Sequence, residues 1–71
     1  MDIRAEICSH QASMHNLKIM GAKKSHARKA ASLLNILSKV KQEERQYAAD
    51  CYFGRCAYRT YEEMISELRG N

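Results

Sequence analysis

The stretch "AASLLNILSKVKQEERQYAADC", from Ala30 to Cys51, decides the fold. Spacings of three and four residues alternate along it without a slip, and they pick out one mostly apolar stripe: Ala30, Leu33, Leu37, Val40, Glu44, Tyr47 and Cys51. Side chains at these spacings lie on one face of an α-helix. The pattern predicts a single long helix over residues 25–53, with Ser25 as its N-cap and Gly54 after its end.

Two further helices flank this one. A stripe with spacings of 4, 3, 4 and 3 predicts a helix over residues 2–20, with Asp2 as its N-cap and Gly21 after its end: Ile3, Ile7, His10, Met14 and Leu17. Near the C-terminus, Thr60 and Glu63 have the spacing of a capping box. The apolar residues that follow lie on one face and predict a short helix over residues 60–69: Tyr61, Met64, Ile65 and Leu68.

Together these patterns predict an all-α fold in a single domain over residues 1–71. No strand-like alternation competes, and the 71 residues contain no proline and only three glycines. We expect an antiparallel helical hairpin with a short third C-terminal helix. In the hairpin register Ile7 faces Val40, and Glu44 lies at the start of the first helix. A carboxylate there would meet free backbone N–H groups, or it could be a polar core residue that sets the register of a dimer.

The predicted long helix extends beyond the first one. Tyr47 and Cys51 therefore need cover, either from the third helix folding back or from a second chain. Because a chain of this size buries only a small core, we favour a homodimer.

Charge is distributed unevenly along the chain, which carries a net charge of +4 at pH 7. Residues 7–42 contain seven cations and no acid, whereas the remainder has five arginines against eight acids. Five of the cations lie within residues 18–29, here called the basic segment: Lys18, Lys23, Lys24, Arg28 and Lys29. Cations near a helix N-terminus favour anion binding, and a phosphate backbone is the commonest large anion. The alternative is a solvated helix surface. Because the segment lacks phenylalanine, tyrosine and tryptophan, it favours backbone contacts with duplex DNA or structured RNA.

A second functional hypothesis rests on residues 52–61, here called the aromatic–arginine segment. All five aromatic residues lie between Tyr47 and Tyr61, and part of this stretch reads "FGRCAYRTY". Tyrosine and arginine are enriched at the centres of protein interfaces, so we take four residues as a candidate surface for an inhibitor or adaptor: Arg55, Tyr58, Arg59 and Tyr61. Alternatively, some of these aromatic side chains form a local core. Residues 46–68 also have the order of a helix-turn-helix, but the spacing around Gly54 does not fit that motif.

Enzymatic and metal-binding motifs are missing from the sequence. There is no phosphate-cradling glycine loop, nucleophile elbow or catalytic triad, so we expect a non-enzymatic regulatory protein without a cofactor. We expect no metal site, because Cys51 and Cys56 have no matching second pair and the hairpin register places Cys8 far from Cys51. An odd number of cysteines favours reduced thiols and a cytoplasmic location, and no apolar run is long enough to span a membrane.

Overall fold

The computed structural model describes residues 3–54 and 56–70, and every regular element within these two ranges is a helix. The elements are α1 (Ile3–Ile19), α2 (Lys23–Leu37), the 3₁₀-helix η1 (Gln42–Glu44), α3 (Arg45–Phe53) and α4 (Tyr61–Leu68). The prediction of an all-α chain is confirmed for this part of the protein. In the same two ranges, no helix combines the length and the apolar character needed to cross a bilayer.

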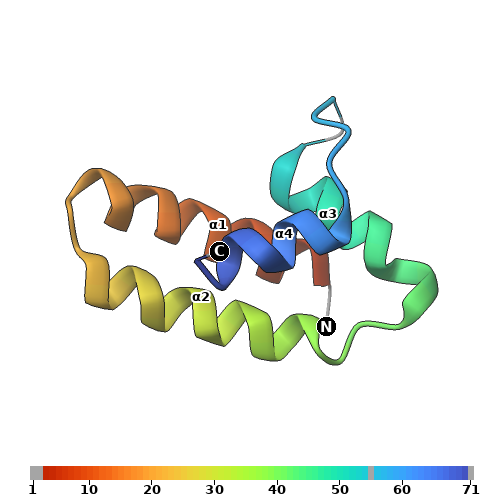
Figure 1. Ribbon diagram of the computed structural model, residues 1–71, viewed down its shortest axis with the longest axis horizontal. Helices are drawn as coiled ribbons and strands as arrows, with labels where there is room; N and C mark the ends of the chain where they lie inside the picture. Colours follow the sequence, from red (N-terminus) through yellow and green to blue (C-terminus); the bar gives the residue numbers. More distant parts are fainter. Residues whose placement is uncertain (1–2, 55, 71) are drawn as a thin grey trace.

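The helices pack around one core. In Figure 1, α1 and α2 lie side by side, and the chain reverses direction between them at residues 20–22. α3 contacts α1, and α4 contacts both α2 and α3. The turn between α1 and α2 lies at one end of the molecule, while η1 lies at the other end. The cations of the basic segment are therefore far from the acids of η1.

The core consists of ten buried apolar residues, contributed by all four α-helices and by the segment after α2: Ile7, Met14, Ala30, Leu33, Leu37, Val40, Ala48, Ala49, Met64 and Leu68. Those in α1, α2 and α4, together with Val40, all belong to the predicted stripes. Because burial of apolar surface is the main stabilising contribution to folding, these stripes identify most of the residues that hold the fold together.

The prediction of one continuous helix over residues 25–53 is wrong. α2 ends at Leu37, and Lys41 has an extended backbone with φ −66° and ψ 150°. The Ser38 hydroxyl donates to the Asn35 carbonyl at 2.6 Å, a local bond of the kind that competes with helical hydrogen bonding. The turn sends α3 back onto α1, so that Ala48 and Ala49 are buried while Tyr47 is 42% exposed. A straight helix would have left that part of the core open to water.

The N-terminus of α2 also differs from the prediction. Ser25 is not an N-cap, because the helix begins at Lys23 with Ala22 in the cap position and no side-chain cap bond. α1 ends before Gly21, which has φ 73° and lies in a Schellman motif, and α2 begins two residues after this glycine. The two bonds of the motif run from the Ala22 N–H to the Leu17 carbonyl at 2.9 Å and from the Gly21 N–H to the Lys18 carbonyl at 3.1 Å. The predicted cap at Asp2 lies outside the described residues.

The capping box at the start of α4 is confirmed. The Glu63 N–H donates to the Thr60 hydroxyl at 3.1 Å, and the Thr60 N–H donates to the Glu63 carboxylate at 3.2 Å. The backbone bond from Thr60, followed by the bond from its hydroxyl, holds the pKa of Glu63 below its usual value. The cap therefore fixes both the start of α4 and the charge state of this carboxylate.

The variant Thr60→Ala should lose about 1 kcal/mol of unfolding free energy at pH 7, because it removes the side chain that accepts the Glu63 N–H. The pKa of Glu63 should rise towards its usual value without reaching it, because the backbone N–H of residue 60 can still donate. A carboxylate with a lowered pKa stabilises the fold above its unfolded-state pKa, and this contribution is lost as the pH falls through the folded-state pKa. The difference between wild type and variant should therefore shrink in acid.

Urea denaturation at pH 7 and in acid, with an NMR titration of Glu63, measures both effects. Ser9→Ala, an exposed serine within α1, is the control for removing a hydroxyl. An equal loss of stability in the two variants would show that the cap contributes nothing of its own.

Candidate nucleic-acid interface

The five cations of the basic segment extend from the end of the molecule where α1 turns into α2 to the middle of α2. Lys18 is in the last turn of α1, and Lys23 and Lys24 are in the first turn of α2; all three are exposed. Arg28 is exposed one turn further along α2, and Lys29 beside it is half-buried. None of the five forms an ion pair within residues 3–54 and 56–70. The segment is therefore a cluster of like charges that the described part of the chain does not neutralise.

The start of α2 reinforces this charge. Its first turn contains no acidic residue and its N-cap residue offers no side-chain acceptor, so the positive end of the helix dipole is not compensated there. Lys23 and Lys24 add two cations at the same end. Each opposes the dipole by roughly 0.3–1 kcal/mol at an exposed position. This arrangement disfavours the isolated helix and favours a bound anion.

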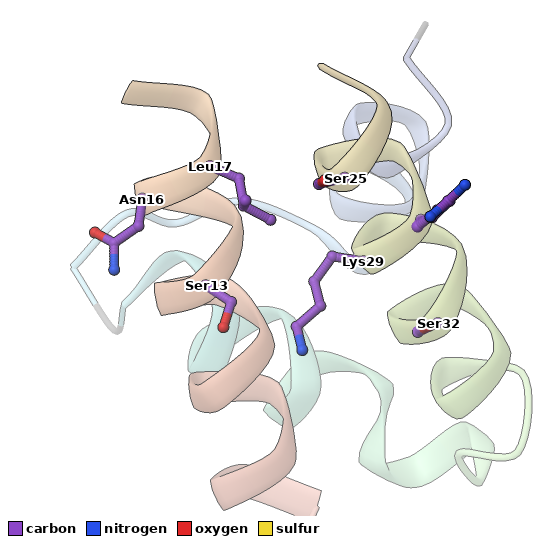
Figure 2. Close-up of a pocket in the computed structure, with 7 residues that line it drawn as sticks. Ser13, Asn16, Leu17, Ser25, Lys29 and Ser32 are labelled. Carbon is purple, nitrogen blue, oxygen red and sulfur yellow. The ribbon is translucent and has the colours of Figure 1, made fainter. Parts of the chain in front are cut away.

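A shallow groove of about 470 Å³ runs between α1 and α2 beside these cations (Figure 2). Its lining residues are spaced three and four apart on each helix: Ser13, Asn16 and Leu17 from α1, and Ser25, Arg28, Lys29 and Ser32 from α2. Lys29 extends from α2 into the space between the helices, with its amino group directed towards α1. The lining contains two cations, three hydroxyls and an amide, and no acid.

A second pocket, of about 210 Å³, lies where α3 and α4 pack on the α1–α2 pair. It is lined by Gln11, Met14, His15, Lys18, His26, Tyr52 and Glu67. Burial raises the pKa of Tyr52, and the nearby Glu67 carboxylate raises it further. Lys18 therefore shares its surroundings with an acid, and the α1/α2 groove is the more strongly cationic of the two sites.

Arg59, one of the predicted interface residues, makes contacts within the protein. Its Nε lies 3.4 Å from a Glu63 carboxylate oxygen, and its Nη2 lies 3.4 Å from a Glu67 carboxylate oxygen. Its guanidinium carbon is 4.3 Å from the centre of the Phe53 ring, within range of a cation–π interaction. Arg59 thus links the end of α3 to α4.

The other interface candidates have different environments. Tyr61 is half-buried, its hydroxyl donates to the Leu37 carbonyl at 3.2 Å, and Arg45 lies 5.3 Å from its ring centre. Tyr58 is 92% exposed and has a positive φ of 51°. Arg55 lies outside the described residues. The structure therefore gives Arg59 and Tyr61 internal roles and leaves the Tyr58 side chain available for external contact.

The prediction that Cys8 lies far from Cys51 is wrong. Both line one pocket of about 360 Å³ within a single chain, together with Arg4, Tyr47, Asp50 and Gly54. They come together because α3 turns back onto α1 instead of continuing α2. Burial is the main cause that raises the pKa of the Cys51 thiol. Within the two described ranges, no three His, Cys, Asp or Glu side chains are placed to hold a metal ion.

The connection between α3 and α4 does not fit a helix-turn-helix. It covers residues 54–60, whereas that motif joins its helices by a turn of about three or four residues. Gly54 begins the connection with a φ of 91°, and the Arg59 contacts fix its far end. The basic segment therefore remains the candidate nucleic-acid interface.

No protein-family model, curated protein or solved structure matches this chain significantly. Its function is therefore inferred from the residues themselves.

The sequence pattern identifies the cations, but the hydroxyl and amide groups beside them were missed. Ser25, Arg28, Lys29 and Ser32 follow the i, i+3, i+4, i+7 pattern of one helix face, and Ser13 and Asn16 have matching spacing on α1. This helical spacing of polar residues, beside the apolar stripes, is the feature of the sequence that indicates the groove.

Proposed function

We propose that this protein is a small non-enzymatic regulator that binds the phosphate backbone of DNA or structured RNA. In this proposal α1 and α2 act as a helical hairpin that presents the basic segment. One observation carries it: Lys23 and Lys24 are exposed in the first turn of a helix without a side-chain cap, Arg28 is exposed one turn further along, and none of the three forms an ion pair in the described ranges.

The attraction to a polynucleotide would be electrostatic. Like charges held close together repel one another. The phosphates of a polyanion would attract these cations and offset their mutual repulsion. Neutralising phosphates with lysine and arginine also releases condensed counterions, which makes such binding favourable and dependent on salt. Because the segment has no phenylalanine, tyrosine or tryptophan, it lacks a large ring on which unpaired bases could stack, which favours contacts to the backbone.

Fluorescence anisotropy with random duplex DNA and with a structured RNA tests the proposal across a range of salt concentrations. The wild type should bind at physiological salt with a Kd in the micromolar range. The variant Lys23/Lys24→Gln should bind more weakly. Its slope of log K against log salt should be shallower by about 1.8, or about 0.9 for each phosphate that the variant no longer neutralises.

The matched control is Lys39/Lys41→Gln, which removes the same charge from exposed lysines between α2 and η1. This control should retain most of the affinity and nearly the full salt slope. Equal losses in the two variants would show that net charge alone attracts the polyanion. No binding even at low salt would refute the proposal.

The alternative function is that of a protein-binding inhibitor or adaptor. The observation that favours it is the 92% exposure of Tyr58, since a tyrosine surrounded by water is a good anchor for a partner's pocket. This function predicts weak salt dependence and a loss of partner binding in Tyr58→Ala, with Lys23/Lys24→Gln unaffected.

We also propose a homodimer and a cytoplasmic location. Cys51 packs against the core within one chain, so the remaining reason to expect a dimer is the 42% exposure of Tyr47. Sedimentation equilibrium would measure the oligomeric state. The three cysteines are free, as expected in a reducing compartment.

A further inference from the structure

We infer that the α1/α2 groove is a binding site for one phosphate group, with Lys29 as its counter-ion. The identity of the ligand rests on the proposed function: the phosphate is a phosphodiester of the bound polynucleotide. Lys23, Lys24 and Arg28 would then contact neighbouring phosphates from the exposed end of the same surface.

Lys29 is the first reason for this assignment. It is half-buried in the groove, whereas Lys18, Lys23 and Lys24 are exposed. Its amino group makes no ion pair or hydrogen bond with the chain from residue 3 to 54 or 56 to 70. No acid lines the groove and none occurs between residues 7 and 42, so an anion that pairs with Lys29 would come from outside the groove.

The neutral side chains around Lys29 are the second reason. Three hydroxyls and one amide line the groove, and none of them forms a hydrogen bond within the two described ranges: Ser13, Asn16, Ser25 and Ser32. Phosphate oxygens are acceptors, and hydroxyl and amide groups supply matching donors. Bonds from neutral donors to an ionised oxygen are stronger than bonds between neutral groups. The donor set therefore suits an anion that is rich in acceptors.

The shape of the groove favours an esterified phosphate over a lone ion. Because the groove is shallow and open, a sugar can lie on either side of a phosphate bound there. Leu17 supplies an apolar wall that can contact a sugar ring. The groove is open to solvent along its length, which lets a continuous backbone enter and leave.

The second pocket, where α3 and α4 pack on the α1–α2 pair, is the competing location for an anion. Its lining disfavours a phosphate. Glu67 contributes a carboxylate to that lining, and a phosphate there would be repelled by a like charge. The acid-free lining of the α1/α2 groove presents no such repulsion. Different residues line the two pockets, so an experiment that resolves individual residues can tell them apart.

The first experiment is an NMR titration of the wild-type protein with dimethyl phosphate, a phosphodiester without a base, and separately with inorganic phosphate. Backbone amide signals of Ser13, Asn16, Ser25 and Ser32 should shift, while that of Glu67 should not. Because this titration needs no variant, it does not depend on how a substitution folds. Unchanged groove signals at saturating polynucleotide would overturn the inference.

The second experiment measures polynucleotide affinity in Lys29→Met, which keeps the apolar stem and removes the charge. We expect a loss of about tenfold, the effect of one hydrogen-bonded charge, and a salt slope shallower by about 0.9. Lys39→Met, an exposed lysine beyond the end of α2, is the control and should change neither quantity.

The outcomes separate the inference from the proposed function. If the wild type binds polynucleotide and Lys29→Met binds as tightly as Lys39→Met, the function stands and the phosphate site is wrong. If the two phosphate probes shift the groove signals but polynucleotide does not bind, the site stands as one for a free phosphate ester and the function is wrong. If none of these ligands binds, both are wrong.

Discussion

The variant Ala48→Glu should leave the protein largely unfolded at pH 7. Ala48 is 0% exposed in α3, which packs against α1 and α4. A carboxylate at this position would be removed from water without a cation to pair with it, at a cost of about 3–5 kcal/mol. The longer side chain would also overpack the site, at roughly 1–3 kcal/mol more. The total stability of a domain is about 5–15 kcal/mol, and a short chain has a small core, so little would remain.

Far-ultraviolet circular dichroism and urea denaturation would measure this loss. Burial raises the pKa of a carboxyl group, so the new side chain becomes neutral as the pH falls. Part of the fold should therefore return at about pH 5. Ala12→Glu, at an exposed position on α1, introduces the same group and should remain folded.

This variant distinguishes the observed arrangement from a continuous helix over residues 25–53. A straight helix would carry Ala48 beyond the reach of α1, and a glutamate there would remain largely solvated. A folded Ala48→Glu protein with unchanged urea sensitivity would therefore contradict the packing of α3 against α1.

The variant Leu33→Ala should destabilise the protein by about 2–5 kcal/mol. Leu33 is 0% exposed, lies in the middle of α2 and belongs to the core cluster formed by all the α-helices. Truncation removes buried carbon atoms and leaves a cavity that the surrounding side chains fill only in part. The helix itself should not weaken, since alanine has the highest helix propensity.

Urea denaturation followed by circular dichroism would measure the change in the transition midpoint. Ile19→Ala is the control, because Ile19 is 71% exposed at the end of α1 and its truncation should alter stability by no more than about 0.5 kcal/mol. Equal midpoints for the two variants would mean that the stripe does not form the core.

The sequence predicts the parts of this fold that depend on local patterns. The apolar stripes in α1 and α2 identify Ile7, Met14, Leu33 and Leu37 as core residues, because helical spacing alone determines which side chains share a face. The capping box of α4 is also local, since Thr60 and Glu63 are three residues apart.

The break between α2 and α3 could not be predicted in the same way. No proline or glycine occurs between Ser25 and Phe53, and the 3,4 spacing continues through the turn to Cys51. What favours the break is distant in sequence, namely the burial of Ala48 and Ala49 against helices that precede and follow them. Tertiary packing here overrides a regular local pattern.

The candidate site can also be predicted only in part. The run of basic residues is visible in the sequence itself, so the sequence predicts Lys23, Lys24 and Arg28 as site residues. That Lys29 differs from them depends on the packing of α1 beside α2, which places this side chain in the groove.

The turn at Gly21 has a consequence for the order in which the protein folds. Bringing α1 against α2 closes only the short link between them, whereas bringing α3 against α1 joins residues that are far apart in the chain. The entropy lost on closing a loop grows with its length, and local contacts form sooner than distant ones. We therefore expect the groove between α1 and α2 to assemble early, with α3 and α4 docking afterwards. The order of assembly would therefore place Lys29 beside its hydroxyl neighbours before the rest of the core closes.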